Sequence, residues 1–160
     1  MSEGPEAARV ANRDDAGRIS ELAGELLATL LDTRGGPPVA ATIAALGGAD
    51  DLEARLALED GGGIVVGTYD GLIVGFAVVD FPQGASPTGA ASVVALYVEP
   101  ELRRVGVGEA LLEEVTRLAR TRGATSLDVP ALPGDSSMKS FLEAMGLRAR
   151  LLIMSRSLGS

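Results

Sequence analysis

The chain has 160 residues, of which 46% are hydrophobic and 3% aromatic, so a single domain with an aliphatic core is expected. It contains no Cys and no His, which excludes disulfides, thiolate or histidine metal sites and every His-dependent nucleophile. The formal net charge of -8 disfavours nucleic acid as a partner and favours cationic ones, although it is also ordinary for an acidic, bacterial-type protein.

The N-terminal stretch lacks the basic and apolar regions of a signal peptide, and no apolar run approaches the roughly 20 residues of a membrane span. A cytoplasmic location without a membrane partner is therefore expected. Carboxylates do not recur at the spacing of a calcium-binding loop, so no metal is expected. Residues 1–7 are expected to form a flexible tail and residues 8–160 a single domain.

The N-terminal half is typical of one short strand followed by helices. A strand is expected at 9–11, and apolar residues then recur at helical spacing over 19–31. The sequence TRGGPP at 33–38 ends that helix. Further helical stretches are expected at 39–46 and 51–58.

The C-terminal half alternates strands and helices. Two strands flank the hairpin turn Asp70-Gly71. The expected strands are 64–69, 72–81, 90–98, 126–129 and 149–156, and the expected helices are 106–122 and 136–145. This order predicts a mixed α+β fold, with a central, mixed and mostly antiparallel sheet of about six to seven strands and helices on both faces.

A glycine-rich turn joins the third of these strands to the helix after it. Its core is Arg103-x-x-Gly106-x-Gly108. Glycine lets the backbone approach a ligand closely, and the unpaired N–H groups and dipole of a helix N-terminus suit a pyrophosphate. The spacing alone is equally consistent with a pyrophosphate-binding turn and with an ordinary strand-to-helix connection that carries two surface arginines. No Gly-Lys-Ser/Thr follows, which excludes a Walker-type phosphate loop, and the spacing disfavours a dinucleotide fingerprint.

Three stretches, in this order, extend the pattern over nearly the whole chain. They are Arg9-x-Ala11-x-x-x-Asp15, Leu96-Tyr97-Val98-x-Pro100-x-x-Arg103-Arg104-x-Gly106-Val107-Gly108 and Asp135-x-x-Met138-x-x-Phe141-Leu142-x-x-x-Gly146-Leu147. Together they resemble the GNAT acetyltransferase superfamily. The central stretch is similar to its acetyl-CoA-binding motif, and the last one fits the spacing of its second region.

The resemblance implies a GNAT-like fold and an N-acetyltransferase that moves the acetyl group of acetyl-CoA directly to a primary amine. The acceptor would be a small cationic amine, a lysine side chain or a peptide N-terminus. Main-chain groups of Leu96 and Val98 would bind the pantetheine arm, and the amide near Val98 would be the oxyanion donor. The cofactor-binding residues implied are Leu96, Tyr97, Val98, Arg103, Arg104, Val105, Gly106, Val107, Gly108, Glu109, Asp135, Ser137, Met138 and Phe141.

Two residues depart from the family pattern. Asp135 stands where the family often has Asn, and since an ionised Asp only accepts hydrogen bonds, capping the helix from Ser136 is the favoured alternative. Leu142 stands where the family commonly has a proton-donating Tyr. Ser136, Ser137, Tyr97 or water would then protonate the departing thiolate.

The proton acceptor is open as well. Asp32, Asp80, Tyr97 and water are candidates, and for both carboxylates an ordinary surface role is favoured. An alternative function is a non-catalytic acyl-CoA-binding or sensing module with the same fold. The apolar segment 151–154 could pair with a second copy in a homodimer.

Overall fold

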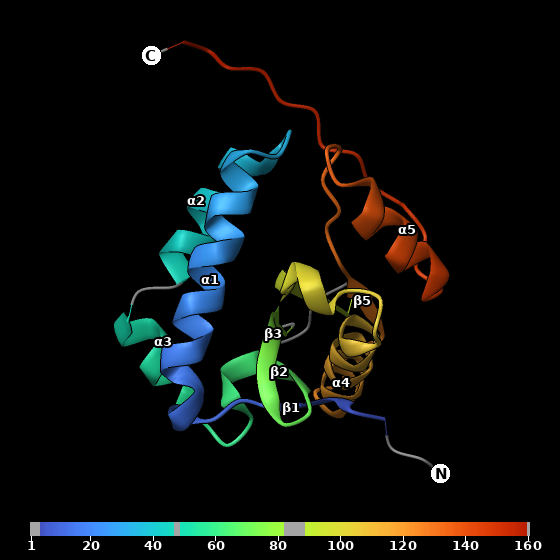
Figure 1. Ribbon diagram of the computed structural model, residues 1–160. Coiled ribbons are helices and arrows are strands. Elements are labelled where there is room, and N and C mark those ends of the chain that lie inside the picture. Colours follow the sequence, from blue (N-terminus) through green and yellow to red (C-terminus); the bar gives the residue numbers. More distant parts are fainter. Residues whose placement is uncertain (1–3, 47–48, 82–88, 160) are drawn as a thin grey trace.

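The computed structural model describes residues 4–46, 49–81 and 89–159 (Figure 1). Within them, five strands form one sheet in the order β1-β2-β3-β4-β5. The strands are β1 (Glu6–Val10), β2 (Ile64–Tyr69), β3 (Leu72–Asp80), β4 (Ala90–Val98) and β5 (Ser126–Asp128). Neighbours from β1 to β4 are antiparallel, whereas β5 runs parallel to β4. The predicted mixed, mostly antiparallel sheet is confirmed.

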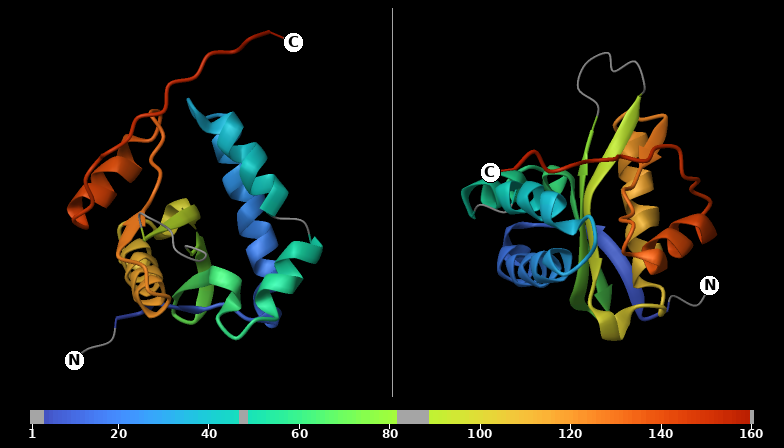
Figure 2. Two further views of the ribbon diagram at one scale, coloured as in Figure 1. Left: turned by 180° about the vertical axis from the view of Figure 1, so that it is seen from behind. Right: turned by 90° about the horizontal axis from the view of Figure 1, so that it is seen from above.

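Helices cover both faces of this sheet (Figure 2). Helices α1 (Ala16–Leu31), α2 (Gly36–Leu46) and α3 (Ala49–Leu56) lie on one face, and α4 (Val107–Thr121) and α5 (Ser136–Ala144) lie on the other. Short 3₁₀ turns stand at η1 (Arg13–Asp15), η2 (Gly61–Gly63) and η3 (Pro100–Leu102). None of the helices in the described ranges is both long and apolar enough to cross a bilayer.

The core is split into two apolar clusters by the sheet, because successive strand side chains point to opposite faces. Phe76 and Tyr97 pack with α1 and its neighbours, whereas Ala77 and Val98 pack with α4. Two glycines let α4 lie close to the sheet. A Cβ on Gly67 would come within 2.7 Å of Val107 Cγ1, and one on Gly75 within 3.2 Å of Leu111 Cδ1.

Most predicted elements are confirmed with small shifts at their ends. Asp70 and Gly71 have φ values of 49° and 81°, as a type I′ hairpin turn requires. The first strand begins at Glu6, earlier than the predicted 9–11, because its ladder with β2 extends to Tyr69.

The prediction of a final strand at 149–156 is wrong for this structure, and the sheet has five strands instead of six to seven. Residues 149–159 have no regular secondary structure and run away from the sheet (Figure 1). Leu151 to Met154 are 72–81% exposed. Four consecutive apolar residues form a stable strand only where neighbours cover both of its faces, and none of the described strands pairs with this segment.

Candidate active site

Strand β4 loses one of its two neighbours part-way along its length. Its ladder with β5 covers only Ala90 to Ser92, which pair with Ser126 to Asp128. Its ladder with β3 continues to Val98. From Val93 onward, β4 therefore has an open edge on which the described chain places no strand.

The main-chain groups of Leu96 and Val98 point to this open edge. The N–H of Glu99 donates to the Val74 carbonyl at 2.9 Å, toward β3. Because backbone groups alternate in direction along a strand, those of Leu96 and Val98 point the other way. The Val98 carbonyl accepts a hydrogen bond from Arg103 Nε at 2.9 Å, which agrees with that direction. This is the direction that their implied role in binding pantetheine requires.

The glycine-rich turn meets the end of this edge. Gly106 has a φ of 97° and is the N-cap of α4, and no side chain caps that helix. The first N–H groups of α4 therefore have no acceptor from a capping side chain. They lie at the positive end of the helix dipole. Val107 is fully buried and anchors the helix start, whereas Arg103, Arg104, Val105 and Glu109 are exposed. Such a turn fits a pyrophosphate.

Helix α5 lies beside the same turn. The Asp135 carboxylate accepts the N–H of Met138 at 3.0 Å, so the predicted helix cap is confirmed. A Cβ on Gly108 would lie 3.3 Å from the ring of Phe141, which places that ring next to the start of α4. Ser137 is exposed. Leu142 is 5% exposed and has no ionisable proton, so it cannot act as the catalytic acid.

Tyr97 faces α1, on the opposite side of the sheet from α4. It is 5% exposed, and its hydroxyl donates to Glu25 Oε2 at 3.1 Å. Burial, followed by that hydrogen bond, raises the pKa of Tyr97. The guanidinium of Arg103 lies 5.6 Å from the ring centroid. Glu25 was not expected from the sequence, where it is one of several polar residues on an amphipathic helix and nothing marks it as the partner of a distant Tyr.

The two carboxylates that are candidate proton acceptors stand on β3 and at the end of α1, and not on the open edge of β4. Asp80 pairs with Ser92 at the far end of β4 from Val98, and its carboxylate accepts from Arg55 Nη2 at 3.4 Å. Asp32 is exposed at the C-terminal end of α1. Neither lines the pocket described next, and their catalytic roles stay predictions.

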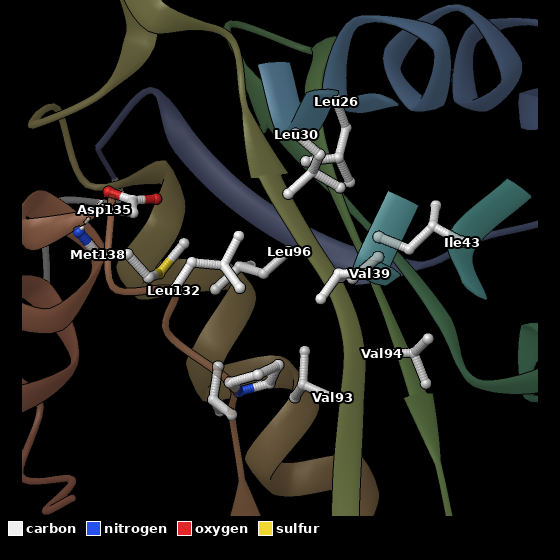
Figure 3. Close-up of a pocket in the computed structure, with 13 residues that line it drawn as sticks. Leu26, Leu30, Val39, Ile43, Val93, Val94, Leu96, Leu132, Asp135 and Met138 are labelled. Atoms are coloured by element: carbon white, nitrogen blue, oxygen red, sulfur yellow. Dashed lines mark hydrogen bonds between the residues drawn. The ribbon is translucent and has the colours of Figure 1, made fainter. Parts of the chain in front are cut away.

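A pocket wraps around the open edge of β4 (Figure 3). Figure 3 shows side chains from α1 and α2 on one side of the strand, and Leu132, Asp135 and Met138 on the other. The lining residues are Leu26, Leu30, Val39, Ile43, Val93, Val94, Ala95, Leu96, Val129, Pro130, Leu132, Asp135 and Met138. In the part of the chain that the structure describes, no group of three or more Asp or Glu residues is arranged to hold a metal ion.

Comparison with known proteins identifies the family. The model of the Acetyltransferase (GNAT) family matches residues 39–147, from α2 through α5, and so includes the open edge and the turn. The chain belongs to the GNAT acetyltransferases. It is therefore an acyltransferase enzyme, as the motif resemblance implied. Among curated protein sequences, none matches this GNAT chain.

Solved structures share the fold of this GNAT acetyltransferase at low sequence identity. AAC(6')-Iy in complex with the bisubstrate analogue CoA-S-monomethyl-acetylneamine is 19% identical, with 95% of this chain and 97% of that chain covered and a TM-score of 0.67. The PaiA N-acetyltransferase from Thermoplasma acidophilum, in complex with coenzyme A, is 17% identical, with 94% and 92% covered and a TM-score of 0.72. The aminoglycoside acetyltransferase meta-AAC0020 from an uncultured soil sample, in complex with sisomicin, is 15% identical, with 97% of each chain covered and a TM-score of 0.68.

Proposed function

We propose that this GNAT acetyltransferase is an N-acetyltransferase that moves the acetyl group of acetyl-CoA directly to the primary amine of a small molecule. The observation that carries the proposal is the meeting of two sets of main-chain donors. The open edge of β4 ends where the uncapped N-terminus of α4 begins, in the segment from Leu96 to Glu109. The solved neighbours with the same fold include complexes with coenzyme A and with a coenzyme A bisubstrate analogue, which supports acetyl-CoA as the co-substrate.

The residues of the turn hold the diphosphate end of the co-substrate. Main-chain N–H groups from Arg104 to Glu109 donate to the pyrophosphate, and the exposed guanidinium of Arg104 adds positive charge. Main-chain groups of Leu96 and Val98 bind the pantetheine arm along the open edge. One of these amides polarises the thioester carbonyl, as an oxyanion donor does. Met138 and Phe141 pack against the arm from α5.

The transfer needs no covalent adduct with the protein. The amine nitrogen forms a bond to the acetyl carbon, the carbon–sulfur bond breaks, and one proton passes from nitrogen to the thiolate through water. The chain has no Cys that could carry the acetyl group. A thiol has a reference pKa of about 8.5, so its thiolate departs without a strong acid. Such a transfer can proceed with Leu142 in place of a proton-donating Tyr.

The site is tested by placing negative charge beside the turn. Val105 is 40% exposed between Arg104 and Gly106, so Val105→Glu changes charge without removing core packing. Coenzyme A affinity, measured by calorimetric titration, is expected to fall by at least about tenfold, and less at high salt. Val105→Gln is the matched control, because Gln has the size of Glu without its charge. It should bind coenzyme A with the affinity of the wild type.

Gly106 is less suitable for this test. Its φ of 97° favours glycine, and a Cβ there would lie 2.9 Å from Glu6 Cγ, so a substitution would also distort the backbone. Wild-type coenzyme A affinity in Val105→Glu, with an unchanged melting temperature, would show that the pyrophosphate does not bind at this turn.

A further inference from the structure

The side of the pocket formed by α1 and α2 is apolar. Leu26, Leu30 and Ile43 are 8%, 7% and 6% exposed, and Val39 beside them is half-buried. Figure 3 shows these four side chains on one side of β4, across the strand from Asp135 and Met138. A ligand group that reaches past the open edge toward α1 and α2 therefore meets hydrocarbon.

Three of the segments that build the pocket carry no charged residue. Residues 35–49, 81–98 and 129–134 contain no Asp, Glu, Lys or Arg, and they supply α2, β4 and the chain that leads to α5. The carboxylate of Asp135 accepts the Met138 N–H, and that of Glu25 accepts the Tyr97 hydroxyl. Of the described residues that line the pocket, Asp135 alone is charged, and it lies on the α5 side.

We infer that the acceptor is a primary amine on an apolar body, such as an alkyl or arylalkyl chain, and that this body binds against Leu26, Leu30, Val39 and Ile43. The inference rests on the proposed function and specifies its substrate class. Burying the apolar surface of such a body against these side chains favours binding. A polyamine or an aminosugar would instead bring ammonium and hydroxyl groups to walls that offer them no hydrogen-bond partners, which weakens binding. The acceptor class thus differs from the aminoglycosides for which several neighbours of the same fold are named.

The apolar wall also favours the neutral form of the amine, which is the form that attacks the thioester. A primary alkylamine is largely protonated in neutral water, and it attacks a thioester only after losing that proton. An apolar surrounding disfavours the ammonium form, so the amine enters the site neutral. In the transfer, nitrogen bonds to the acetyl carbon, the carbon–sulfur bond breaks, and water carries one proton from nitrogen to sulfur. A chain without His can therefore use desolvation where other enzymes use a base.

A matched amine panel tests the acceptor class by release of coenzyme A thiol from acetyl-CoA. 2-Phenylethylamine and hexylamine are expected to have kcat/KM values at least about tenfold above those of spermidine and kanamycin. A preference for spermidine or kanamycin would overturn the inference and leave the proposed function standing. A preference for hexanoyl-CoA over acetyl-CoA, with no discrimination among amines, would assign the apolar wall to the acyl chain and also overturn it.

A binding measurement separates this inference from the proposed function. 2-Phenylethylamine is titrated into protein saturated with coenzyme A, which requires no turnover. Saturable binding is expected for the wild type, and its absence would overturn the inference. Binding without thiol release from any amine would contradict the proposed function instead.

Two variants locate the binding wall. Val39→Asp should weaken 2-phenylethylamine binding by at least about tenfold and spare coenzyme A binding. Leu31→Asp adds the same charge at a 63% exposed position of α1 that does not line the pocket, and should bind the amine as the wild type does. Equal losses in both variants would overturn the placement. If Val39→Asp fails to fold, Val39→Thr makes the same comparison with a smaller expected loss.

Discussion

Arg103 Nε donates to the carbonyl oxygen of Val98 at 2.9 Å and so fastens the glycine-rich turn to the end of β4. The two residues lie on either side of η3, five positions apart. The bond therefore joins the end of β4 directly to the residue that begins the turn before α4.

Removing this bond should weaken co-substrate binding more than folding. We expect Arg103→Ala to lower coenzyme A affinity by about tenfold and the free energy of unfolding by about 0.5–1 kcal/mol, because the side chain is exposed. Calorimetric titration and urea denaturation measure the two effects. Arg120→Ala removes an equal charge in the last turn of α4 and is the control. Equal losses of affinity in both variants would show that only net charge matters.

The Asp135 side chain caps α5, and we expect an Asn side chain to stabilise the protein equally well at this position. Asp135→Ala should lower the free energy of unfolding by about 1 kcal/mol, since the Met138 N–H loses its acceptor. Asp135→Asn should retain both stability and coenzyme A affinity, because Asn caps helices equally well. Thermal denaturation and coenzyme A titration check the pair of variants. Lower coenzyme A affinity in Asp135→Asn at unchanged stability would mean that the carboxylate itself contacts the co-substrate.

The Tyr97–Glu25 contact predicts a stabilising role for the hydroxyl. Tyr97→Phe should lower the free energy of unfolding by about 1 kcal/mol and leave the rate of thiol release within about twofold of the wild type. Because the folded-state pKa of Tyr97 is raised, its contribution is complete below the unfolded pKa of about 10 and is lost as the pH rises through the folded value. A double-mutant cycle with Glu25→Gln measures the coupling. A large loss of rate in Tyr97→Phe at unchanged stability would identify Tyr97 as the catalytic acid.

Gly75 is crowded and Gly24 is not, so replacing each with Ala should change the free energy of unfolding in opposite directions. Gly75→Ala should lower the free energy of unfolding by about 1–3 kcal/mol, because its Cβ would meet the Tyr97 carbonyl at 2.7 Å and backbone cannot move aside cheaply. Gly24→Ala, with no atom within 4 Å and inside α1, should raise it by about 0.5–1 kcal/mol. Chemical denaturation of both variants tests the close approach of β3 to β4 at Gly75. A neutral Gly75→Ala would contradict it.

The ion pair of Arg9 and Asp15 should make the free energy of unfolding depend on pH in the acidic range. Asp15 is 5% exposed and accepts hydrogen bonds from both terminal nitrogens of Arg9, at 2.7 and 2.9 Å. Arg9 lowers the pKa of Asp15, so the stabilisation is present above the unfolded pKa of about 3.9 and is lost as the pH falls through the folded value.

Asp15→Asn should therefore cost about 1–2 kcal/mol at neutral pH, a figure that allows for the 46% exposure of the Arg9 side chain. The difference from the wild type should shrink below about pH 4. Thermal unfolding at a series of pH values checks this, and a constant difference over the whole series would exclude the ion pair as its source.

The elements with strong local signals could be predicted from the sequence. Asp70-Gly71 requires a hairpin, and the apolar stripe with Gly123 at its end predicts α4 closely. The accessible main-chain groups of Leu96 and Val98 were implied only by the family resemblance, because the open edge of β4 depends on where β5 stops pairing at Asp128, and no local pattern marks that point. The Tyr97–Glu25 contact joins residues 72 positions apart and has no local signal. The segment from Leu151 to Met154 was expected to be a strand because it is apolar, but burial depends on a neighbour that the sequence does not specify.

Release of coenzyme A thiol from acetyl-CoA, measured with and without a primary amine, tests the proposed function most directly. We expect thiol release that depends on both the amine and the enzyme, an acetylated amine as product, and loss of activity in Val105→Glu but not in Val105→Gln. Tight coenzyme A binding without amine-dependent thiol release would contradict it, and would indicate a binding or sensing module that has this fold but does not catalyse the transfer.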